Sequence, residues 1–160
     1  MSELLKKESV NRVDEYLKKF NPSLKIVVLD ATARTAKDAA NSLKCELGAI
    51  VKSLVFKAEG EFLICLVAGD KRCSLNKLKK LINKKDVCMA SPAEVKTQTG
   101  YSIGGVSPIG HLSSMRIFID NSLERFIDLY AAAGHPNCVF KIDFKNLQKI
   151  TNGSIEELSE

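Results

Sequence analysis

The sequence predicts a single α/β domain built on a mixed β-sheet. The chain has 160 residues, its short β-branched runs alternate with segments that carry helix-start signals, and two apolar runs flank one glycine-containing turn. A length of about 150 residues is typical of one domain with a sizeable core. Strands interleaved with helices indicate an α/β arrangement, and a hairpin makes part of the sheet antiparallel.

The first third of the chain predicts a helix, a strand and a second helix. Apolar residues recur at three- and four-residue steps and place a helix over 10–20: Val10, Val13, Leu17 and Phe20. The run at 24–29 is β-branched and predicts a buried strand. Thr35 and Asp38 form a start signal for the second helix, which we expect to stop at Gly48.

The middle of the chain predicts a hairpin and a basic helix. The apolar runs at 50–57 and 61–68 are separated by Ala58-Glu59-Gly60, a connection typical of paired strands. Ser74 caps a third helix, which we expect to turn four apolar side chains inward: Leu75, Leu78, Leu81 and Ile82. The same region holds the densest basic patch of the sequence: Lys77, Lys79, Lys80, Lys84 and Lys85.

The last part of the chain predicts further strands and two capped helices. Ser91-Pro92-Ala93-Glu94 is a helix start, and Gly100 closes that helix. Strands are expected at 86–90, 115–120 and 138–142. Periodicity does not distinguish helix from strand at 122–133. Asp143 caps a last helix, and we expect the acidic tail after Gly153 to be frayed.

Composition excludes several classes of protein. The net charge is +5, and 45% of the residues are hydrophobic, which is ordinary for a globular chain. Membrane spans need about 20 consecutive apolar residues, and no run approaches that length. The start of the chain lacks the apolar segment of a secretory signal, so we expect a cytoplasmic protein. The five cysteines form no C-x-x-C pair, and we expect neither a metal nor a cofactor.

Four features of the sequence could belong to a binding or catalytic site, and each also has an ordinary structural explanation. The glycine-rich stretch 100–110 either joins two elements or brings bare backbone close to a ligand. Lys52, within an apolar strand, either extends its ammonium into water or holds an anion at a pocket mouth. His135 is either a solvated loop histidine or a polar group at a pocket rim. Asp30 ends an apolar run, where turn formation is the ordinary role.

Four segments, taken together and in this order along the chain, are specific enough to indicate a protein family. They are R-T-A-K-D-A-A at 34–40, I-V-K-S-L-V-F at 50–56, G-Y-S-I-G-G-V-S-P-I-G-H at 100–111 and A-A-A-G-H-P-N-C-V-F at 131–140. In this combination the chain, from Val10 to Gly153, resembles the YbaK-like aminoacyl-tRNA deacylases. That family is related to the editing domain inserted in bacterial prolyl-tRNA synthetases.

The resemblance implies a fold and a set of site residues. The fold would be a mixed, partly barrel-like sheet surrounded by helices, with residues 1–160 forming one editing domain. Lys52, Gly104 of the G-x-x-x-P motif and His135 would be catalytic. Substrate-binding positions are expected at Gly105, Val106, Ser107, Pro108, Gly134 and Asp30.

The resemblance also implies a reaction, hydrolysis of the ester that joins a wrong amino acid to the 3′ adenosine of tRNA. An aminoacyl ester is already activated, so positioning matters more than a strong nucleophile. Glycine backbone N–H groups could stabilise the oxyanion, Lys52 could hold a phosphate or ribose, and His135 could orient a water.

The implied partner is the acceptor end of aminoacyl-tRNA, with tRNA for proline carrying Ala, 2-aminobutyrate or Cys as the expected substrate. Prolyl-tRNA synthetase or an elongation factor are further candidate partners, and no membrane is expected. A non-catalytic module that binds RNA or a synthetase is the alternative. A thiol enzyme is the third reading, and it would depend on Cys138, three residues from His135. The sequence leaves the oligomeric state open.

Overall fold

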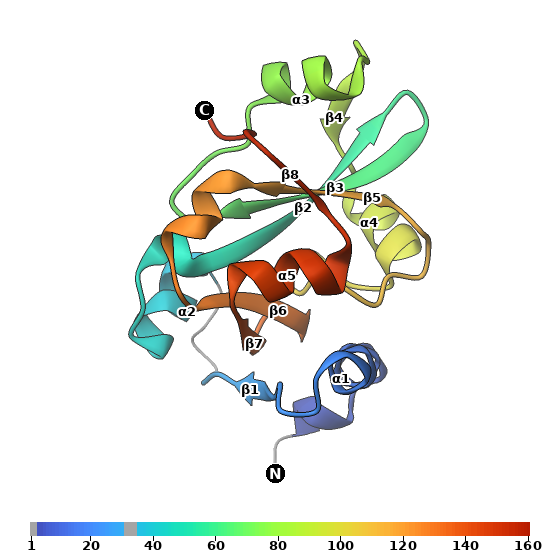
Figure 1. Cartoon of the computed structure of the whole chain (residues 1–160). Coiled ribbons are helices and arrows are strands. Elements are labelled where there is room, and N and C mark those ends of the chain that lie inside the picture. Colours follow the sequence, from blue (N-terminus) through green and yellow to red (C-terminus); the bar gives the residue numbers. More distant parts are fainter. Residues whose placement is uncertain (1–2, 31–34) are drawn as a thin grey trace.

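A mixed sheet of eight strands forms the centre of the part of the chain that is described, residues 3–30 and 35–160 of a computed structural model (Figure 1). The strands are β1 (Ile26–Val28), β2 (Ile50–Ala58), β3 (Glu61–Ala68), β4 (Val87–Met89), β5 (Arg116–Asp120), β6 (Leu129–His135), β7 (Cys138–Ile142) and β8 (Ser154–Glu156). The α-helices are α1 (Glu8–Phe20), α2 (Ala36–Leu43), α3 (Leu75–Ile82), α4 (Pro92–Thr99) and α5 (Phe144–Thr151). Short 3-10 helices span Glu3–Lys6, Leu47–Ala49 and Asn121–Arg125.

The strand order β1-β7-β6-β2-β3-β5-β8 confirms the predicted mixed sheet. β2 and β3 form the expected antiparallel hairpin, and its turn uses the left-handed conformation at Glu59 and Gly60. β2 is parallel to β6, while β3 and β8 both lie parallel to β5. The hairpin and the three parallel pairs together make this an α/β domain with a mixed sheet.

One edge of β2 is shared by two different strands. Ile50 and Val51 pair with β6, and Phe56–Ala58 pair with β4. β3 occupies the opposite edge along the length of β2. Residues 52–54 therefore lie on a short edge with no strand partner among the described strands.

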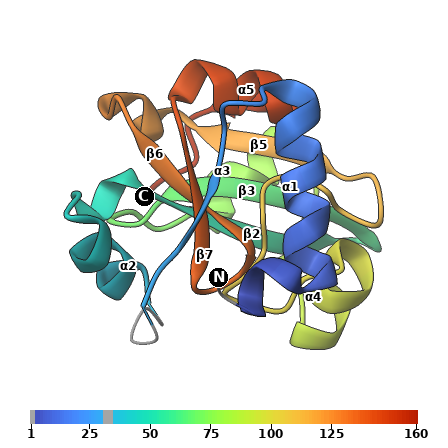
Figure 2. The ribbon, with the colours of Figure 1, turned by 90° about the horizontal axis from the view of Figure 1, so that it is seen from below.

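The core lies on both faces of this sheet. Residues of α1, α4 and α5 pack with Val55 and Ile64 on one face, while α3 packs with Phe56 and Cys65 on the other. Cys65 is fully buried, as its apolar run predicts. Figure 2 shows α1 crossing the sheet on the face that also carries α4 and α5.

Four predicted helix starts are confirmed by their hydrogen bonds. Each cap side chain accepts from the backbone N–H three residues later, and the caps are Thr35, Ser74, Ser91 and Asp143. Ser91 and Glu94 form a reciprocal capping box, and Gly100 ends α4 in the left-handed conformation. These local signals are strong because a capping side chain satisfies an otherwise unpaired helix N–H.

Three local expectations are wrong. α2 ends at Leu43 rather than at Gly48, with Lys44 in the left-handed conformation, and Gly48 instead allows Phe126 to pack closely. β1 is a three-residue strand with Val27 half-exposed, because β7 is its one described partner and it lies at the end of the sheet. Leu75 and Leu81 of α3 are largely exposed, whereas Leu78 and Ile82 are buried.

The C-terminal segment is ordered, which corrects the expectation of a frayed tail. β8 pairs in parallel with β5, and Leu158 is fully buried. The buried carboxylate of Asp120 accepts hydrogen bonds from the backbone N–H groups of Leu158 and Ser159 at 2.7 and 3.0 Å. These long-range contacts fix a segment that carries no local signal for order.

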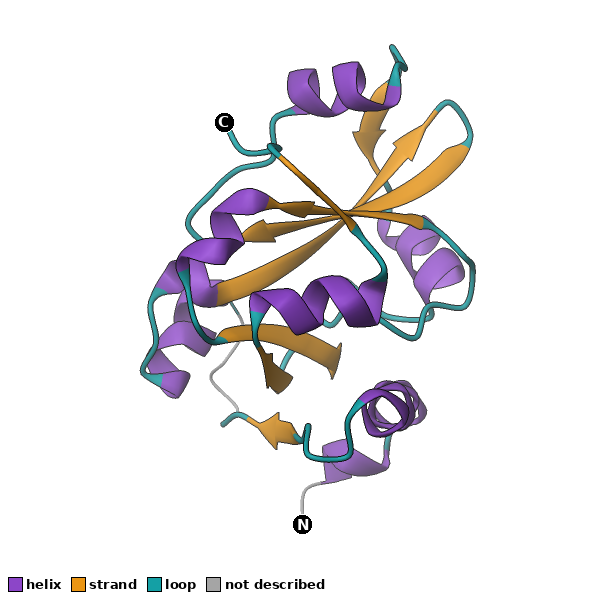
Figure 3. Cartoon of the chain, viewed as in Figure 1, coloured by secondary structure: helices purple, strands orange, loops and turns teal. Residues whose placement is uncertain are grey.

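The segment 122–133, open at the level of sequence, divides into two elements. Its first part belongs to the 3-10 helix Asn121–Arg125, and its second part is β6 (Figure 3). In the described residues, no helix has the length and apolar character needed to cross a membrane.

Candidate functional site

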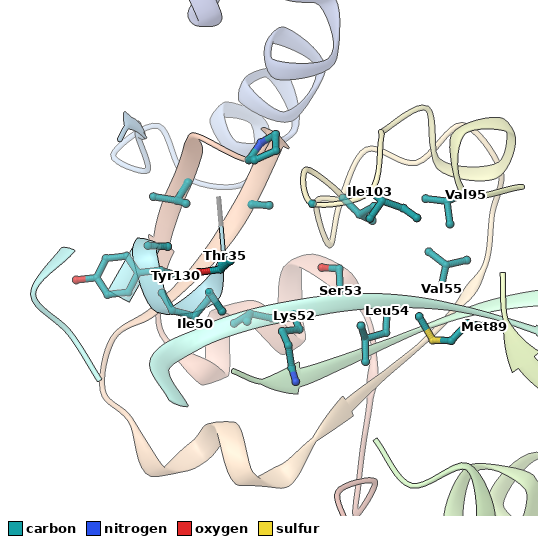
Figure 4. A pocket seen from close by; sticks show the side chains of 18 of the residues that line it. Thr35, Ile50, Lys52, Ser53, Leu54, Val55, Met89, Val95, Ile103 and Tyr130 are labelled. Atoms are coloured by element: carbon teal, nitrogen blue, oxygen red, sulfur yellow. The ribbon is translucent and has the colours of Figure 1, made fainter. Parts of the chain in front are cut away.

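A cavity of about 280 Å³ opens beside the unpaired edge of β2. Its walls come from the start of α2, from β2 and β4, from α4, from the glycine-rich loop and from β6 and β7 with the turn between them (Figure 4). The lining is mostly apolar and includes Ile50, Val51, Leu54, Val55, Met89, Ala90, Val95, Ile103, Val106, Ala132 and Val139. A small, mostly apolar hollow with few polar groups is typical of a site for a small organic ligand.

The four segments quoted from the sequence converge on this cavity. Thr35, Ala36 and Ala39 come from the first segment, and residues 50–55 from the second. The third segment contributes 103, 104 and 106, and the fourth contributes 132, 136 and 139. Arg34, at the start of the first segment, lies outside the described residues.

Lys52 lines the cavity at the edge of β2, but its side chain points away from the cavity. Figure 4 shows the nitrogen on the side of β2 opposite to Ser53. The ammonium donates a hydrogen bond to the carbonyl oxygen of Lys71. The expected cation at the mouth of this cavity is thus turned toward the other face of the strand.

A second cavity lies on that other face. It has a volume of about 520 Å³ and shares Lys52, Leu54 and Met89 with the first. Arg72 and Ser74, the N-cap of α3, also line it. Desolvation lowers the pKa of Lys52, Asp70 opposes that effect, and the nearby positive charge of Arg72 adds to it. Two cations and a helix N-terminus favour an anion in this second cavity, while the carboxylate of Glu160, which also lines it, opposes one.

Gly104 lines the first cavity in a conformation that favours glycine. Its φ is +92°, and a Cβ at this position would lie 3.4 Å from Cγ of Pro136. Gly105 packs against the backbone of His135, where a Cβ would come within 2.8 Å of the His135 Cα. The glycine-rich turn and the β6–β7 turn therefore support each other at the cavity wall.

The rest of the glycine-rich loop is held by a set of buried hydrogen bonds. The Tyr101 hydroxyl lies 2.7 and 3.0 Å from the carbonyl oxygens of Ile109 and Gly110. Arg12 of α1 donates to the Gly110 carbonyl at 2.8 Å, and its guanidinium lies over the Tyr101 ring. Burial is the main reason that the pKa of Tyr101 rises to about 12, so the hydroxyl stays protonated.

His111 anchors the same loop. Its Nε2 lies 2.7 Å from the carbonyl oxygen of Ser107, which can only accept, so Nε2 carries the proton. Burial lowers the pKa of His111 and favours the neutral ring. This histidine therefore fixes the loop.

The remaining predicted loop positions divide between wall and support. Val106 lines the cavity, whereas Ser107 and Pro108 are buried and do not appear in the wall. The Ser107 hydroxyl accepts a weak hydrogen bond from the Ile109 N–H at 3.4 Å.

The structure does not bring His135, Gly134 or Asp30 into the cavity wall. Nδ1 of His135 accepts from the Asn137 N–H at 3.0 Å, and burial lowers the pKa of its ring. Gly134 packs against the backbone of α1, where Ser9 donates to its carbonyl at 3.0 Å. Asp30 is exposed, and its carbonyl accepts from the Asn137 side chain.

Sequence reasoning overlooked several lining residues, chiefly Ser53. In a strand, alternate side chains point to opposite faces. Lys52 therefore shares a face with Leu54 and Phe56, and Ser53 shares the cavity face with Val51 and Val55. This period of two was visible in I-V-K-S-L-V-F and could have identified Ser53.

The cavity can hold a small, mostly apolar group, and its lining contains little that could act as a strong nucleophile. Cys138 is fully buried and burial raises the pKa of its thiol, which disfavours the thiolate that a thiol enzyme needs. Within residues 3–30 and 35–160, no three His, Cys, Asp or Glu side chains are grouped as metal ligands would be.

Comparison with known proteins gives one family over most of the chain. Residues 30–150 match the family described as the aminoacyl-tRNA editing domain. The uncharacterised protein YwhH of Bacillus subtilis is 31% identical over 144 residues, which cover 89% of this chain and 91% of YwhH.

Further similarity is to proline–tRNA ligases and to solved structures. The ligase of Oleidesulfovibrio alaskensis is 32% identical over 99 residues, 62% of this chain but 17% of the ligase. A crystal structure of a candidate trans-editing enzyme for prolyl-tRNA synthetase superimposes with a TM-score of 0.92 at 37% identity, covering 96% of this chain and 98% of the other. The structure of the hypothetical protein APE2540 superimposes with a TM-score of 0.86 at 27% identity, covering 93% of this chain and 99% of the other.

Proposed function

The chain belongs to the family of aminoacyl-tRNA editing domains, and on that premise we propose that it hydrolyses the ester of mischarged aminoacyl-tRNA. The proposed substrate is tRNA for proline that carries a small amino acid such as Ala, 2-aminobutyrate or Cys. The observation that carries this proposal is the convergence of four family-like segments on one small cavity.

The size and lining of the cavity suit the aminoacyl group. A volume of about 280 Å³ is near the lower end of the range for ligand sites, about 300–1,000 Å³. The apolar wall would accept a short aliphatic side chain, while the backbone at Gly104, which lines the cavity, would lie next to the ester. Gly105 lies behind the wall, and its N–H donates to the Ser102 carbonyl at 2.9 Å. A backbone N–H placed at Gly104 would stabilise the oxyanion that forms when water attacks the carbonyl.

The second cavity suits the phosphates of the tRNA end. Lys52 lies between the two cavities, with its backbone at one and its ammonium directed toward the other, where Arg72 adds positive charge. In this proposal Lys52 and Arg72 hold the terminal phosphodiesters while the amino acid occupies the apolar cavity. His135 is then a positioning residue, which acts through its backbone contact with Gly105.

The lysines of α3 extend this positive surface. Lys77, Lys79 and Lys80 lie on the helix that begins at the second cavity, and Lys84 and Lys85 follow its end. Basic side chains bind nucleic acid mainly through phosphate contacts, and such binding weakens with salt. We propose that the acceptor stem of the tRNA lies along this helix.

The test is a panel of mischarged tRNAs for proline carrying Ala, Cys, Ser or 2-aminobutyrate, each mixed with the purified protein. Loss of the radiolabelled ester is measured over the uncatalysed rate. The proposal predicts turnover of at least one ester. Salt-sensitive tRNA binding with every ester left intact would support the alternative, a non-catalytic module that recognises the acceptor end.

A further inference from the structure

One polar side chain in the cavity wall, Ser53, makes no hydrogen bond with the described part of the chain. The Oγ atom of Ser53 is buried, and it has no hydrogen-bond partner within residues 3–30 and 35–160. Figure 4 shows the hydroxyl on the cavity side of β2, the same side as Val55 and Ile103. A buried hydroxyl without a partner is unfavourable, and rotation about the Cα–Cβ bond of Ser53 would turn it toward a ligand that could pair with it.

The other polar side chains among the described lining residues already make a hydrogen bond or point away from the cavity. The Thr35 hydroxyl accepts from the Asp38 N–H and caps α2. The Lys52 ammonium bonds to the Lys71 carbonyl on the other face of the strand. Figure 4 shows the Tyr130 hydroxyl directed away from the cavity centre. Ser53 therefore offers a hydroxyl without a partner in the described chain, whereas the Thr35 hydroxyl already accepts one hydrogen bond and keeps only its own hydrogen to donate.

We infer that Ser53 makes this cavity selective for an aminoacyl group with a hydroxyl at the γ position, as in serine, over its alkyl counterpart 2-aminobutyrate. The inference rests on the proposed function and refines it, because it adds seryl-tRNA to the small aminoacyl esters proposed above and ranks it ahead of the 2-aminobutyryl ester. Serine, cysteine and 2-aminobutyrate have similar shapes and differ mainly in the γ atom. An apolar wall alone discriminates poorly between such side chains, whereas a hydrogen-bonding group in the wall disfavours the one that cannot pair with it.

Ser53 binds in this scheme and does not attack the ester. A serine nucleophile needs a neighbouring base within hydrogen-bond reach. The Oγ atom has no such neighbour in the described chain, and its cavity-side neighbours Val51 and Val55 are apolar. The thiol of cysteine is a weak donor, so cysteinyl-tRNA should fall between the seryl and 2-aminobutyryl esters.

The test compares kcat/KM for seryl- and 2-aminobutyryl-tRNA in the wild type and in Ser53→Ala. We expect the wild type to favour the seryl ester, and Ser53→Ala to reduce the seryl-to-aminobutyryl ratio roughly 3- to 10-fold, the effect of one neutral hydrogen bond. Ser53→Thr keeps a hydroxyl and should retain most of the ratio. Ser102→Ala removes the same atom from an exposed loop serine outside the cavity wall and should leave the ratio unchanged.

Two readouts separate failure of this inference from failure of the proposed function. If wild-type protein hydrolyses esters but Ser53→Ala leaves the ratio unchanged, the hydroxyl serves a group common to all substrates and the inference is wrong. If no ester is hydrolysed, the selectivity is tested by measuring the affinity of the wild type for the non-hydrolysable 3′-seryl and 3′-aminobutyryl amides of adenosine. Equal affinity of the wild type for both amides would overturn the selectivity. Thermal unfolding of Ser53→Ala, expected at or above the wild-type temperature, confirms that the fold is intact.

Discussion

At the scale of single residues, Lys52 is notable because it lies between the two cavities. Its backbone forms part of the wall of the first cavity, beside β2, while its ammonium extends toward Arg72 and the second cavity. Such a side chain can contact phosphate without occupying space needed by the amino acid. The pKa of Lys52 is lowered, mainly by desolvation, so its charge is lost at a lower pH than that of an exposed lysine.

Lys52→Ala should reduce kcat/KM for ester hydrolysis about 10- to 100-fold, the effect of one charge-assisted hydrogen bond. Lys145→Ala, on the exposed side of α5, is the matched control and should retain full activity. In the wild type, tRNA affinity should decline as the pH rises toward 10.5, the ordinary pKa of lysine, and Lys52→Ala should show a smaller decline because it has one ammonium fewer to lose. Equal rates for the two variants would exclude a substrate contact by Lys52.

Tyr101 is the residue on which the glycine-rich loop depends most. Tyr101→Phe removes a buried hydroxyl and leaves the carbonyls of Ile109 and Gly110 with fewer partners. We expect a loss of about 1–2 kcal/mol in the free energy of unfolding, measured by urea denaturation with an unchanged m-value. Tyr16→Phe, at a tyrosine that is 48% exposed, should change the stability by less than about 0.5 kcal/mol.

At the scale of elements, the sequence predicted best those features that depend on interactions between residues close in sequence. Helix starts at Thr35, Ser74, Ser91 and Asp143 depend on hydrogen bonds over three residues, so their signals are complete within short windows. The hairpin followed from a turn that requires left-handed backbone at Glu59 and Gly60. The order of β8 could not be predicted, because Asp120 and β5 hold it from more than thirty residues away.

In the candidate site, too, some features could be predicted from the sequence and others could not. Family-like segments identified which stretches of chain matter, and Lys52 and Gly104 do line one cavity. The segments could not show that the Lys52 ammonium points away or that the His135 ring lies outside the wall. The Lys52 ammonium is held by the Lys71 carbonyl, 19 residues away, and the His135 ring is turned toward the Asn137 N–H within its own turn, a contact that no sequence pattern announces.

Helix α3 is the element that should govern tRNA affinity. Replacing Lys79, Lys80 and Lys84 together by Ala should raise the Kd for tRNA and reduce the salt dependence of log Kd by roughly 2–3, about 0.9 for each lost phosphate contact. The melting temperature should hardly change, since these side chains are solvated. A triple Lys-to-Ala change at Lys18, Lys19 and Lys25 serves as the charge-matched control. If both sets weaken binding equally, the tRNA does not lie preferentially along α3.

At the scale of the whole molecule, Asp120 joins the C-terminal segment to the sheet. Burial alone would raise the pKa of this carboxyl, but hydrogen bonds from Ser122, Leu158 and Ser159 together outweigh it and lower the pKa. Because the folded pKa lies below the ordinary value of 3.8, the unfolded chain takes up the proton first as the pH falls. The stabilising contribution of Asp120 is therefore present above pH 3.8 and lost below it.

Asp120→Ala should lower the free energy of unfolding by at least about 2 kcal/mol at pH 7, since several buried donors lose their acceptor. Asp128→Ala, at an exposed position, should have little effect. Between neutral pH and pH 3 the difference in stability between the wild type and Asp120→Ala should shrink, as followed by urea denaturation at each pH. A difference that is constant with pH would contradict the ionised, multiply bonded carboxylate.

The central claim is that the cavity beside β2 receives the aminoacyl end of tRNA. The direct measurement is binding of a non-hydrolysable 3′-aminoacyl amide of adenosine, followed through the backbone amide signals of isotope-labelled protein. We expect the largest shifts at Thr35, Ser53 and Gly104, with smaller shifts at Arg72. Shifts confined to α5 and β8, with none at Ser53 or Gly104, would contradict the assignment of this cavity.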